Sequence, residues 1–194
     1  AWKRAAADIA VDEQMNSDCL WMDSTDFKKQ RTAGSGRRSV DFIYKCNGLG
    51  RSYMVLRGGD GLILKIWGGY SPKLYDGHFL EMWSGWLEKK LNGAGVFADQ
   101  HFEWGKKNLN QVKFFTPFKR PPRKRSRDGR DVARLTKDQE EFNAKLQRIR
   151  ARVEVPFAWA KNKFASLSHP WAESDAQLDS LVLIAFGCYN FNRK

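Results

Sequence analysis

The order in which strand and helix patterns follow one another is the feature that most limits how this 194-residue chain folds. Apolar runs of strand length come first, followed by a helical stripe, two more short runs and two long helical patterns. The stretch 19–27 opens with an apolar run that ends in Asp23, and further strand patterns cover residues 39–44, 51–57, 62–67, 95–98 and 112–115. The helical patterns cover 77–91, 136–164 and 173–191. This order predicts a single α/β domain in which a mixed sheet is flanked by helices.

Local signals add detail to this plan. The sequence GGDG at residues 58–61 predicts a tight turn that joins two strands as a hairpin. Thr136 and Gln139 form a capping-box pattern at the start of the first long helix. Pro156 lies inside the same helical pattern and predicts a kink or a split near Val155, because proline cannot donate the helical hydrogen bond.

The chain is strongly basic. It contains 34 Lys and Arg residues against 22 Asp and Glu residues, which gives a net charge of +12. Such an excess predicts a polyanionic partner, with nucleic acid favoured over an anionic membrane. No run of 18 apolar residues occurs, so no segment is predicted to span a bilayer. The 3 cysteines form no CxxC pair, which favours reduced thiols in an intracellular protein over a disulfide framework or a zinc site.

Basic residues gather in two segments that lack apolar periodicity. Residues 28–38 are rich in glycine and serine, and residues 118–135 form a basic loop insertion that contains two prolines. For the second segment, a solvated linker and a phosphate-binding loop are both open, as is a nuclear-localisation role. Residues 1–17 are expected to form a helical lead-in. The candidate DNA-binding residues of the loops and their surroundings are Lys28, Lys29, Arg31, Arg37, Arg38, Lys106, Lys107, Lys119, Arg120, Arg123, Lys124 and Arg125.

Two acidic residues follow strand patterns and a third lies in a helical pattern far downstream, although composition alone does not distinguish these three from the other acids. Asp23 and Asp99 each follow an apolar strand pattern, and Glu154 lies among bases and aromatic residues in the long helical pattern. Acids at strand ends can meet at one edge of a sheet, and carboxylate oxygens suit Mg²⁺ or Mn²⁺. Other roles are open: Asp23 can cap a turn, and Glu154 can form a helical ion pair with Arg150, four residues earlier.

Four motifs together suggest a family. WMDSTDF (21–27), YDGHF (75–79), FADQHFEWGK (97–106) and FNAKLQRIRARVEVPFAWAKNKF (142–164) resemble the conserved elements of DDE endonucleases, specifically transposases of the Harbinger type. The last motif is the most specific, because it keeps the family's spacing of Arg150, Glu154 and Lys161. The resemblance covers most of the chain and implies an RNase H-like fold, with a mixed five-stranded sheet flanked by helices.

The resemblance also implies an activity and a set of site residues. Asp23, Asp99 and Glu154 would be the catalytic residues and would ligate two Mg²⁺ or Mn²⁺ ions, while Arg150 and Lys161 would contact DNA or support the site. The implied activity is hydrolysis at transposon ends followed by strand transfer, with water and then a freed 3′-hydroxyl as nucleophile. The implied setting is a nuclear homodimer or higher assembly on double-stranded DNA, with a separate DNA-binding partner protein.

Two other functions remain open from the sequence. A domesticated, catalytically inactive descendant would act as a DNA-binding or chromatin adaptor, and an RNase H-like nuclease would act on RNA. Asp76 is either an acid that supports the metal ligands or the N-cap of the helix that follows it. The aromatic residues Phe102, Trp104 and Trp159 either stack on bases or pack in the core. A break after Glu154 is expected to aim this acid at the sheet edge while Trp159 and Lys161 face DNA.

Overall fold

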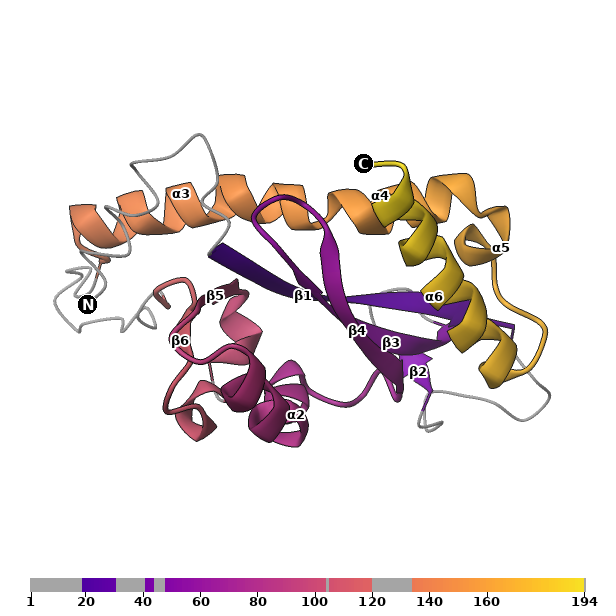
Figure 1. Cartoon of the computed structure of the whole chain (residues 1–194), viewed down its shortest axis with the longest axis horizontal. Helices are drawn as coiled ribbons and strands as arrows, with labels where there is room; N and C mark the ends of the chain where they lie inside the picture. The colour runs from indigo at the N-terminus through magenta and orange to yellow at the C-terminus, as the bar shows by residue number, and fades with distance from the viewer. Residues whose placement is uncertain (1–18, 31–40, 44–47, 104, 120–133, 194) are drawn as a thin grey trace, which may run out of the picture.

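The computed structural model describes residues 19–30, 41–43, 48–103, 105–119 and 134–193 (Figure 1). The predicted lead-in at 1–17 and most of the two basic segments lie outside these residues. The described strands are β1 (Cys19–Lys29), β2 (Phe42–Ile43), β3 (Gly48–Arg57), β4 (Ile63–Tyr70), β5 (Gly95–Ala98) and β6 (Lys113–Phe115). The helices are α2 (Asp76–Lys90), the short η2 (Gln100–Phe102) and η3 (Gly105–Asn108), α3 (Lys137–Val153), α4 (Val155–Lys163), α5 (Ala165–Ser168) and α6 (Asp175–Phe191).

The sheet is mixed and is built around β1. Antiparallel β3 pairs with one edge of β1, and parallel β5 pairs with the other edge, followed by parallel β6. On its far side β3 pairs with β4 and with the two-residue β2. The five longer strands therefore have the order β4–β3–β1–β5–β6, which is the arrangement of an RNase H-like fold. The predicted mixed α/β sheet is confirmed, with β2 as a short additional strand.

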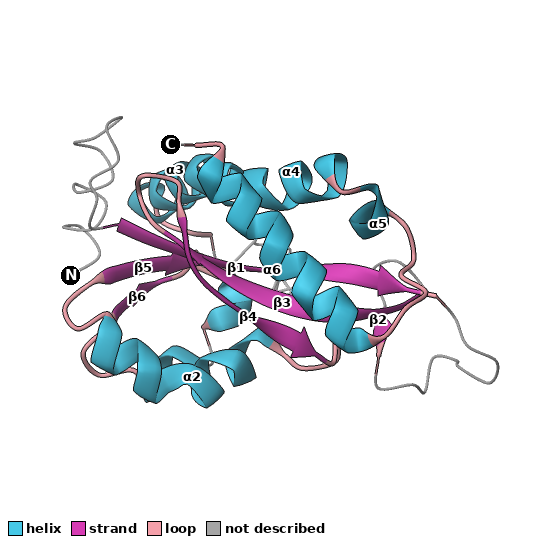
Figure 2. Ribbon diagram, turned by 45° about the vertical axis from the view of Figure 1, so that its right-hand side comes forward, coloured by secondary structure: helices cyan, strands magenta, loops and turns pink. Residues whose placement is uncertain are grey.

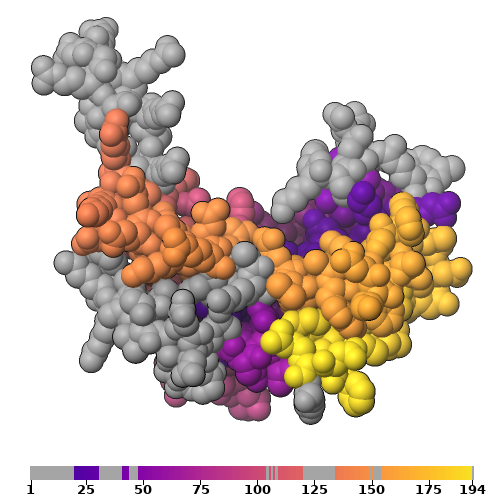
Figure 3. Space-filling model, turned by 90° about the horizontal axis from the view of Figure 1, so that it is seen from above, coloured from indigo at the N-terminus to yellow at the C-terminus, as the bar shows by residue number. Residues whose placement is uncertain are grey.

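Helices cover both faces of the sheet (Figure 2). Helix α2 packs on one face, where Phe79, Leu80 and Leu87 lie against Met22 and Met54. Helices α4 and α6 pack on the opposite face through a second buried cluster, and α3 covers β1 and β5 through a third. Seen from above, α3 and α4 run across this face with the C-terminal end of α6 beside them (Figure 3). None of the helices in the described ranges is long and apolar enough to cross a membrane.

Strand alternation decides which part of β1 faces α3 and α4. Successive side chains of a strand point to opposite faces of the sheet. Met22 belongs to the cluster under α2, whereas Trp21 and Phe27 belong to the clusters under α3, α4 and α6. Asp23 and Thr25 lie between Trp21 and Phe27 in the same alternation, so they share the face that α3 and α4 cover.

The predicted interruption of the long helix is confirmed. Helix α3 ends at Val153, and α4 begins at Val155 with Glu154 as its N-cap residue. Pro156 is buried in the first turn of α4, where a missing N–H is tolerated. The predicted capping box is also present, because the backbone N–H groups of Thr136 and Gln139 bond to each other's side chains at 3.0 and 3.3 Å.

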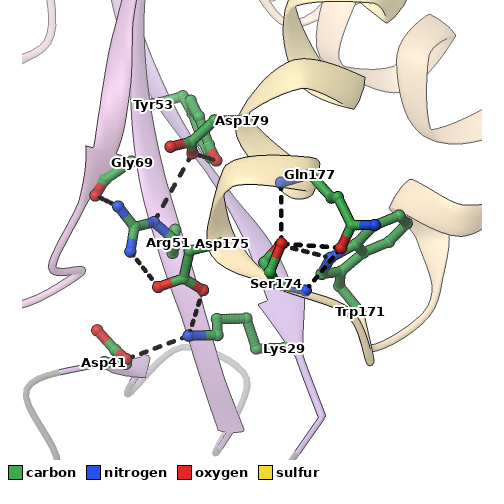
Figure 4. Close-up of polar contacts among 10 residues, drawn as sticks. All are labelled: Lys29, Asp41, Arg51, Tyr53, Gly69, Trp171, Ser174, Asp175, Gln177 and Asp179. Atoms are coloured by element: carbon green, nitrogen blue, oxygen red, sulfur yellow. Dashed lines mark hydrogen bonds and ion pairs between the residues drawn. The ribbon is translucent and has the colours of Figure 1, made fainter.

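A polar cluster fastens α6 to the sheet (Figure 4). The Nζ atom of Lys29 lies 2.6 Å from Asp175 and 3.4 Å from Asp41. Arg51 pairs with Asp175 and donates to the carbonyl oxygen of Gly69. The Tyr53 hydroxyl donates to Asp179, and burial together with this carboxylate raises the pKa of Tyr53 well above its usual value. Lys29, a predicted DNA contact, is therefore engaged in ion pairs within the fold.

Replacing Tyr53 by phenylalanine is expected to lower the free energy of unfolding by about 1–2 kcal/mol, because a buried hydrogen bond to a charged acceptor is lost. The aromatic ring, which packs edge-on to Phe27, is kept. Urea unfolding followed by tryptophan fluorescence measures the change. Tyr75→Phe is the matched control, since Tyr75 is 43% exposed and its variant should stay within about 0.5 kcal/mol of the parent. Equal losses in both variants would contradict a role for the Tyr53–Asp179 bond.

Candidate active site

Asp23 and Asp99 lie side by side because of the register between β1 and β5. These strands run parallel, and Met22 pairs with Ala98, the last residue of β5. The residue that follows Met22 is Asp23, and the residue that follows Ala98 is Asp99. The expectation that Asp23 ends its strand is wrong, since β1 continues to Lys29. It continues because β3 pairs with β1 well beyond the point where β5 stops. The two acids therefore mark the end of the parallel pairing.

Backbone hydrogen bonds orient both carboxylates. The Oδ1 atom of Asp23 accepts from the backbone N–H of Ser24 at 2.8 Å, and the Oδ1 atom of Asp99 accepts from the backbone N–H of Gln100. The second contact makes Asp99 the N-cap of η2. Each Oδ2 atom faces the guanidinium of Arg150, which lies 2.8 Å from Asp99 through Nη2 and 4.0 Å from Asp23 through Nε. The two acids thus converge on one point.

Asp23 is the more buried acid, and its surroundings disfavour its charge. It is 8% exposed. Burial raises the pKa of Asp23 to about 6, and the nearby charges of Asp99 and Asp76 act in the same direction. Arg150 and the Ser24 N–H oppose this shift without cancelling it. A buried acid whose pKa is raised toward neutral pH, and which lies beside two other acids, is typical of a site built to receive a cation.

Asp76 is linked to the pair through Ser24. Its Oδ1 atom accepts a hydrogen bond of 3.0 Å from the Ser24 hydroxyl. Helix α2 begins at Asp76 itself, and its N-cap residue is Tyr75. The N-cap interpretation of Asp76 is therefore wrong by one position. The structure instead connects Asp76 to the residue that follows Asp23, as expected of an acid that supports the site.

Glu154 occupies a different environment. It is exposed at the junction of α3 and α4. Each step of four residues along an α-helix rotates the side-chain direction about 40° beyond a full turn. The side chains of Phe142, Leu146, Arg150 and Glu154 therefore point in successively different directions, and the first two are buried. In the described parts of the chain, no group of three or more His, Cys, Asp or Glu side chains is placed to hold a metal ion. The structure gathers Asp23 and Asp99 and leaves Glu154 outside this group.

Lys161 points toward the sheet. Its Nζ atom donates a 3.1 Å hydrogen bond to Thr25 Oγ1 and lies 5.1 Å from the centre of the Phe27 ring. Lys161 belongs to α4, whose N-cap residue is Glu154. The structure thus places the Lys161 side chain against β1 at Thr25, which is two residues after Asp23 in the sequence. The contact with Thr25 was not predicted, although the alternation from Trp21 to Phe27 indicates that Thr25 shares the face of Asp23.

The structure describes some of the other predicted site residues and leaves the rest outside its described ranges. Lys28, Lys107 and Lys119 are exposed, so they are accessible to a polyanion. Lys106 lies in η3. Of the two roles left open for Phe102 and Trp159, the structure supports core packing, since Phe102 is fully buried and the half-buried Trp159 lies against Tyr189 and Phe164. The residues Arg31, Arg37, Arg38, Trp104, Arg120, Arg123, Lys124 and Arg125 lie outside the described residues.

The Asp23–Asp99 pair fits a divalent cation. Both acids offer oxygen, the ligand atom that Mg²⁺ and Mn²⁺ prefer. Both are held by the backbone so that one oxygen of each remains directed at a shared position. The shared position already attracts positive charge, as the placement of Arg150 demonstrates. Asp76 is a further acid beside the pair, because it is bonded to Ser24 and its charge acts on Asp23.

The raised pKa of Asp23 predicts how stability depends on pH. The folded protein holds this proton up to a pKa of about 6, whereas the unfolded chain releases it near the ordinary aspartate pKa of 3.8. The folded state binds more protons between these values, so Asp23 lowers the free energy of unfolding as pH rises through this window, by about 3 kcal/mol in total. Urea unfolding of the wild-type and Asp23→Asn proteins from pH 4 to 7 isolates this contribution. A difference between them that does not change with pH would contradict it.

Fold and site together define an RNase H-like domain with an acid pair at the edge of its parallel strands. The chain matches the family model described as "Transposase DDE domain" over residues 15–191. Because this match covers nearly the whole sequence, the chain belongs to the transposase DDE domain family.

A solved structure is also similar to this chain. It is the cryo-electron-microscopy structure of a simian T-cell lymphotropic virus intasome in complex with the PP2A regulatory subunit B56 gamma. Sequence identity is 9%, the TM-score is 0.40, and the similarity covers 89% of this chain and 48% of that one. The chain therefore spans about half the length of the solved chain. A search of curated proteins finds no match.

Proposed function

We propose that this domain is a divalent-metal-dependent DNA endonuclease and transposase of the Harbinger type. The observation that supports this most is the convergence of Asp23 and Asp99, whose Oδ2 atoms face one position where the parallel pairing of β1 and β5 ends. Membership of the transposase DDE domain family supports the reaction class. The motif at 142–164, with Arg150, Glu154 and Lys161 at the spacing of Harbinger-type proteins, supports the subtype.

In this proposal the acids hold metal and do not attack the substrate. Asp23 and Asp99 would bind Mg²⁺ or Mn²⁺, with Glu154 as the third ligand. When bound, such ions supply the activation of water or a 3′-hydroxyl and the stabilisation of the leaving oxygen in phosphodiester chemistry. The chain contributes orientation: the N–H groups of Ser24 and Gln100 fix the two carboxylates before substrate arrives. Lys161 donates to Thr25, which lies two residues after Asp23 on the same face of β1.

The proposed substrate is double-stranded DNA at transposon ends and at the target. The net charge of +12 supports a polyanionic partner, and the exposed Lys28, Lys107 and Lys119 are accessible for phosphate contacts. Phosphate contacts position DNA without selecting its sequence. We therefore assign end recognition to a further region or a partner protein, and we propose a nuclear homodimer or higher assembly on DNA.

A supercoiled-plasmid assay tests this function. Wild-type protein with Mg²⁺ or Mn²⁺ should convert the supercoiled form to the nicked form, and EDTA should stop the conversion. The plasmid and a double-stranded RNA of equal length are offered in parallel, and cleavage of DNA alone is expected. DNA binding without nicking under any divalent ion would favour the inactive adaptor function instead. Preferential cleavage of RNA would favour an RNA nuclease.

A further inference from the structure

The guanidinium of Arg150 stands where the two acids converge. Its Nη2 atom is 2.8 Å from Asp99 Oδ2, and its Nε atom is 4.0 Å from Asp23 Oδ2. The Oδ1 atoms of both acids are engaged by backbone N–H groups. The Oδ2 atoms are therefore the ones left to bind a cation, and they face Arg150.

Helix α3 delivers this guanidinium to the acids. Phe142 and Leu146 are buried in a cluster with Trp21 and Phe97, which belong to β1 and β5. Arg150 comes one further turn along the same helix face. The packing of α3 on the two strands that carry the acids thus fixes where the Arg150 side chain begins.

The contacts of Arg150 leave it able to move. Its side chain is 34% exposed, against 11% for Asp23 and 20% for Asp99. Its Nε atom is buried and has no hydrogen-bond partner within the described residues. A paired arginine normally gains most from two parallel hydrogen bonds, and here one close contact, to Asp99, dominates. Leaving the acids would cost Arg150 this one close contact, and its side chain is the most exposed of the three.

We propose that Arg150 is the resident counter-ion of the Asp23–Asp99 pair, that a divalent cation displaces its guanidinium, and that Arg150 thereby sets the metal affinity of the site. The metal in this statement rests on the proposed function. The physical reason is that an ion ligated by both Oδ2 atoms must occupy the position that the guanidinium holds. Two cations that compete for the same oxygens weaken each other's binding.

Direct Mn²⁺ binding without DNA tests the proposal. Free Mn²⁺ is measured by electron paramagnetic resonance during titration of the wild-type, Arg150→Gln and Arg148→Gln proteins. Arg148 is exposed on the same helix, so its variant removes one positive charge without touching the acids. Arg150→Gln should bind Mn²⁺ about tenfold more tightly than wild type, which corresponds to one hydrogen bond between charged groups. Arg148→Gln should stay within about twofold.

Two results would overturn the proposal. One is an Arg150→Gln protein that binds Mn²⁺ no more tightly than wild type, including the case in which neither binds. The other is an equal gain in both variants, which would indicate a general charge effect. Thermal unfolding without Mn²⁺ verifies that each variant is folded. The proposed function can fail independently of this inference. If Arg150→Gln binds Mn²⁺ more tightly but the wild-type protein does not nick DNA, the counter-ion role is supported and the nuclease function is rejected. If the wild-type protein nicks DNA but Arg150→Gln binds Mn²⁺ no more tightly, the nuclease function is supported and the counter-ion role is rejected.

Discussion

Asp23→Asn is expected to abolish DNA nicking while it stabilises the folded protein at neutral pH. Activity should fall at least about 10³-fold, because a metal ligand that contributes several kcal/mol to the reaction is lost. Stability should rise by about 1–3 kcal/mol at pH 7, because the buried carboxylate whose pKa is raised to about 6 is replaced by a neutral amide of the same shape. Plasmid nicking and urea unfolding of the same preparation measure both effects.

Asp26→Asn is the matched control for this prediction. Asp26 lies on the same strand, on the opposite face, where it accepts a hydrogen bond from Ser52. Its variant should nick DNA like wild type and should not become more stable. Loss of activity in Asp23→Asn that comes with loss of stability would indicate a structural role for Asp23 and would contradict the assignment.

Glu154→Gln is expected to lose nicking to a similar extent, at least about 10³-fold, with no change in stability beyond about 0.5 kcal/mol. The activity would fall because the third ligand of the proposed metal site is removed. The stability would hold because Glu154 is exposed and makes no side-chain cap to α4. The same nicking assay, together with Mn²⁺ titration, measures the loss.

Glu141→Gln provides the comparison for Glu154. Glu141 is also an exposed acid, but it lies in α3, far along the helix from the α3–α4 junction. This variant should retain full activity. If Glu154→Gln nicks DNA as well as Glu141→Gln does, Glu154 has no part in the reaction, and the site is limited to Asp23, Asp99 and their neighbours.

The sequence predicts the fold better than it predicts the site. Apolar runs, the GGDG turn, the capping box at Thr136 and the break at Pro156 are local signals, and each appears in the structure as expected. The extent of β1 beyond Asp23 could not be predicted in the same way. It depends on pairing with β3 along its length, which is a tertiary property.

The apolar runs that precede Asp23 and Asp99 predict that these acids meet at a sheet edge, but they do not predict the relation of the acids to Arg150. Spacing along a helix indicates only that Arg150 and Glu154 are neighbours. Packing of Phe142 and Leu146 on β1 and β5 decides that Arg150 faces the acids. Glu154 lies exposed at the junction of α3 and α4, and Lys161 of α4 contacts Thr25, neither of which helical spacing alone indicates.

The position of a bound Mn²⁺ ion tests the central claim most directly. Crystals of the wild-type protein grown with Mn²⁺ and measured at a wavelength where manganese scatters anomalously would locate the ion without reference to activity. We predict an anomalous peak in direct contact with the carboxylates of Asp23 and Asp99, at about 2.0–2.2 Å, with the Arg150 guanidinium moved away from both. A fully loaded crystal with no peak between these two acids, or with its peak elsewhere on the molecule, would contradict the assignment of this site.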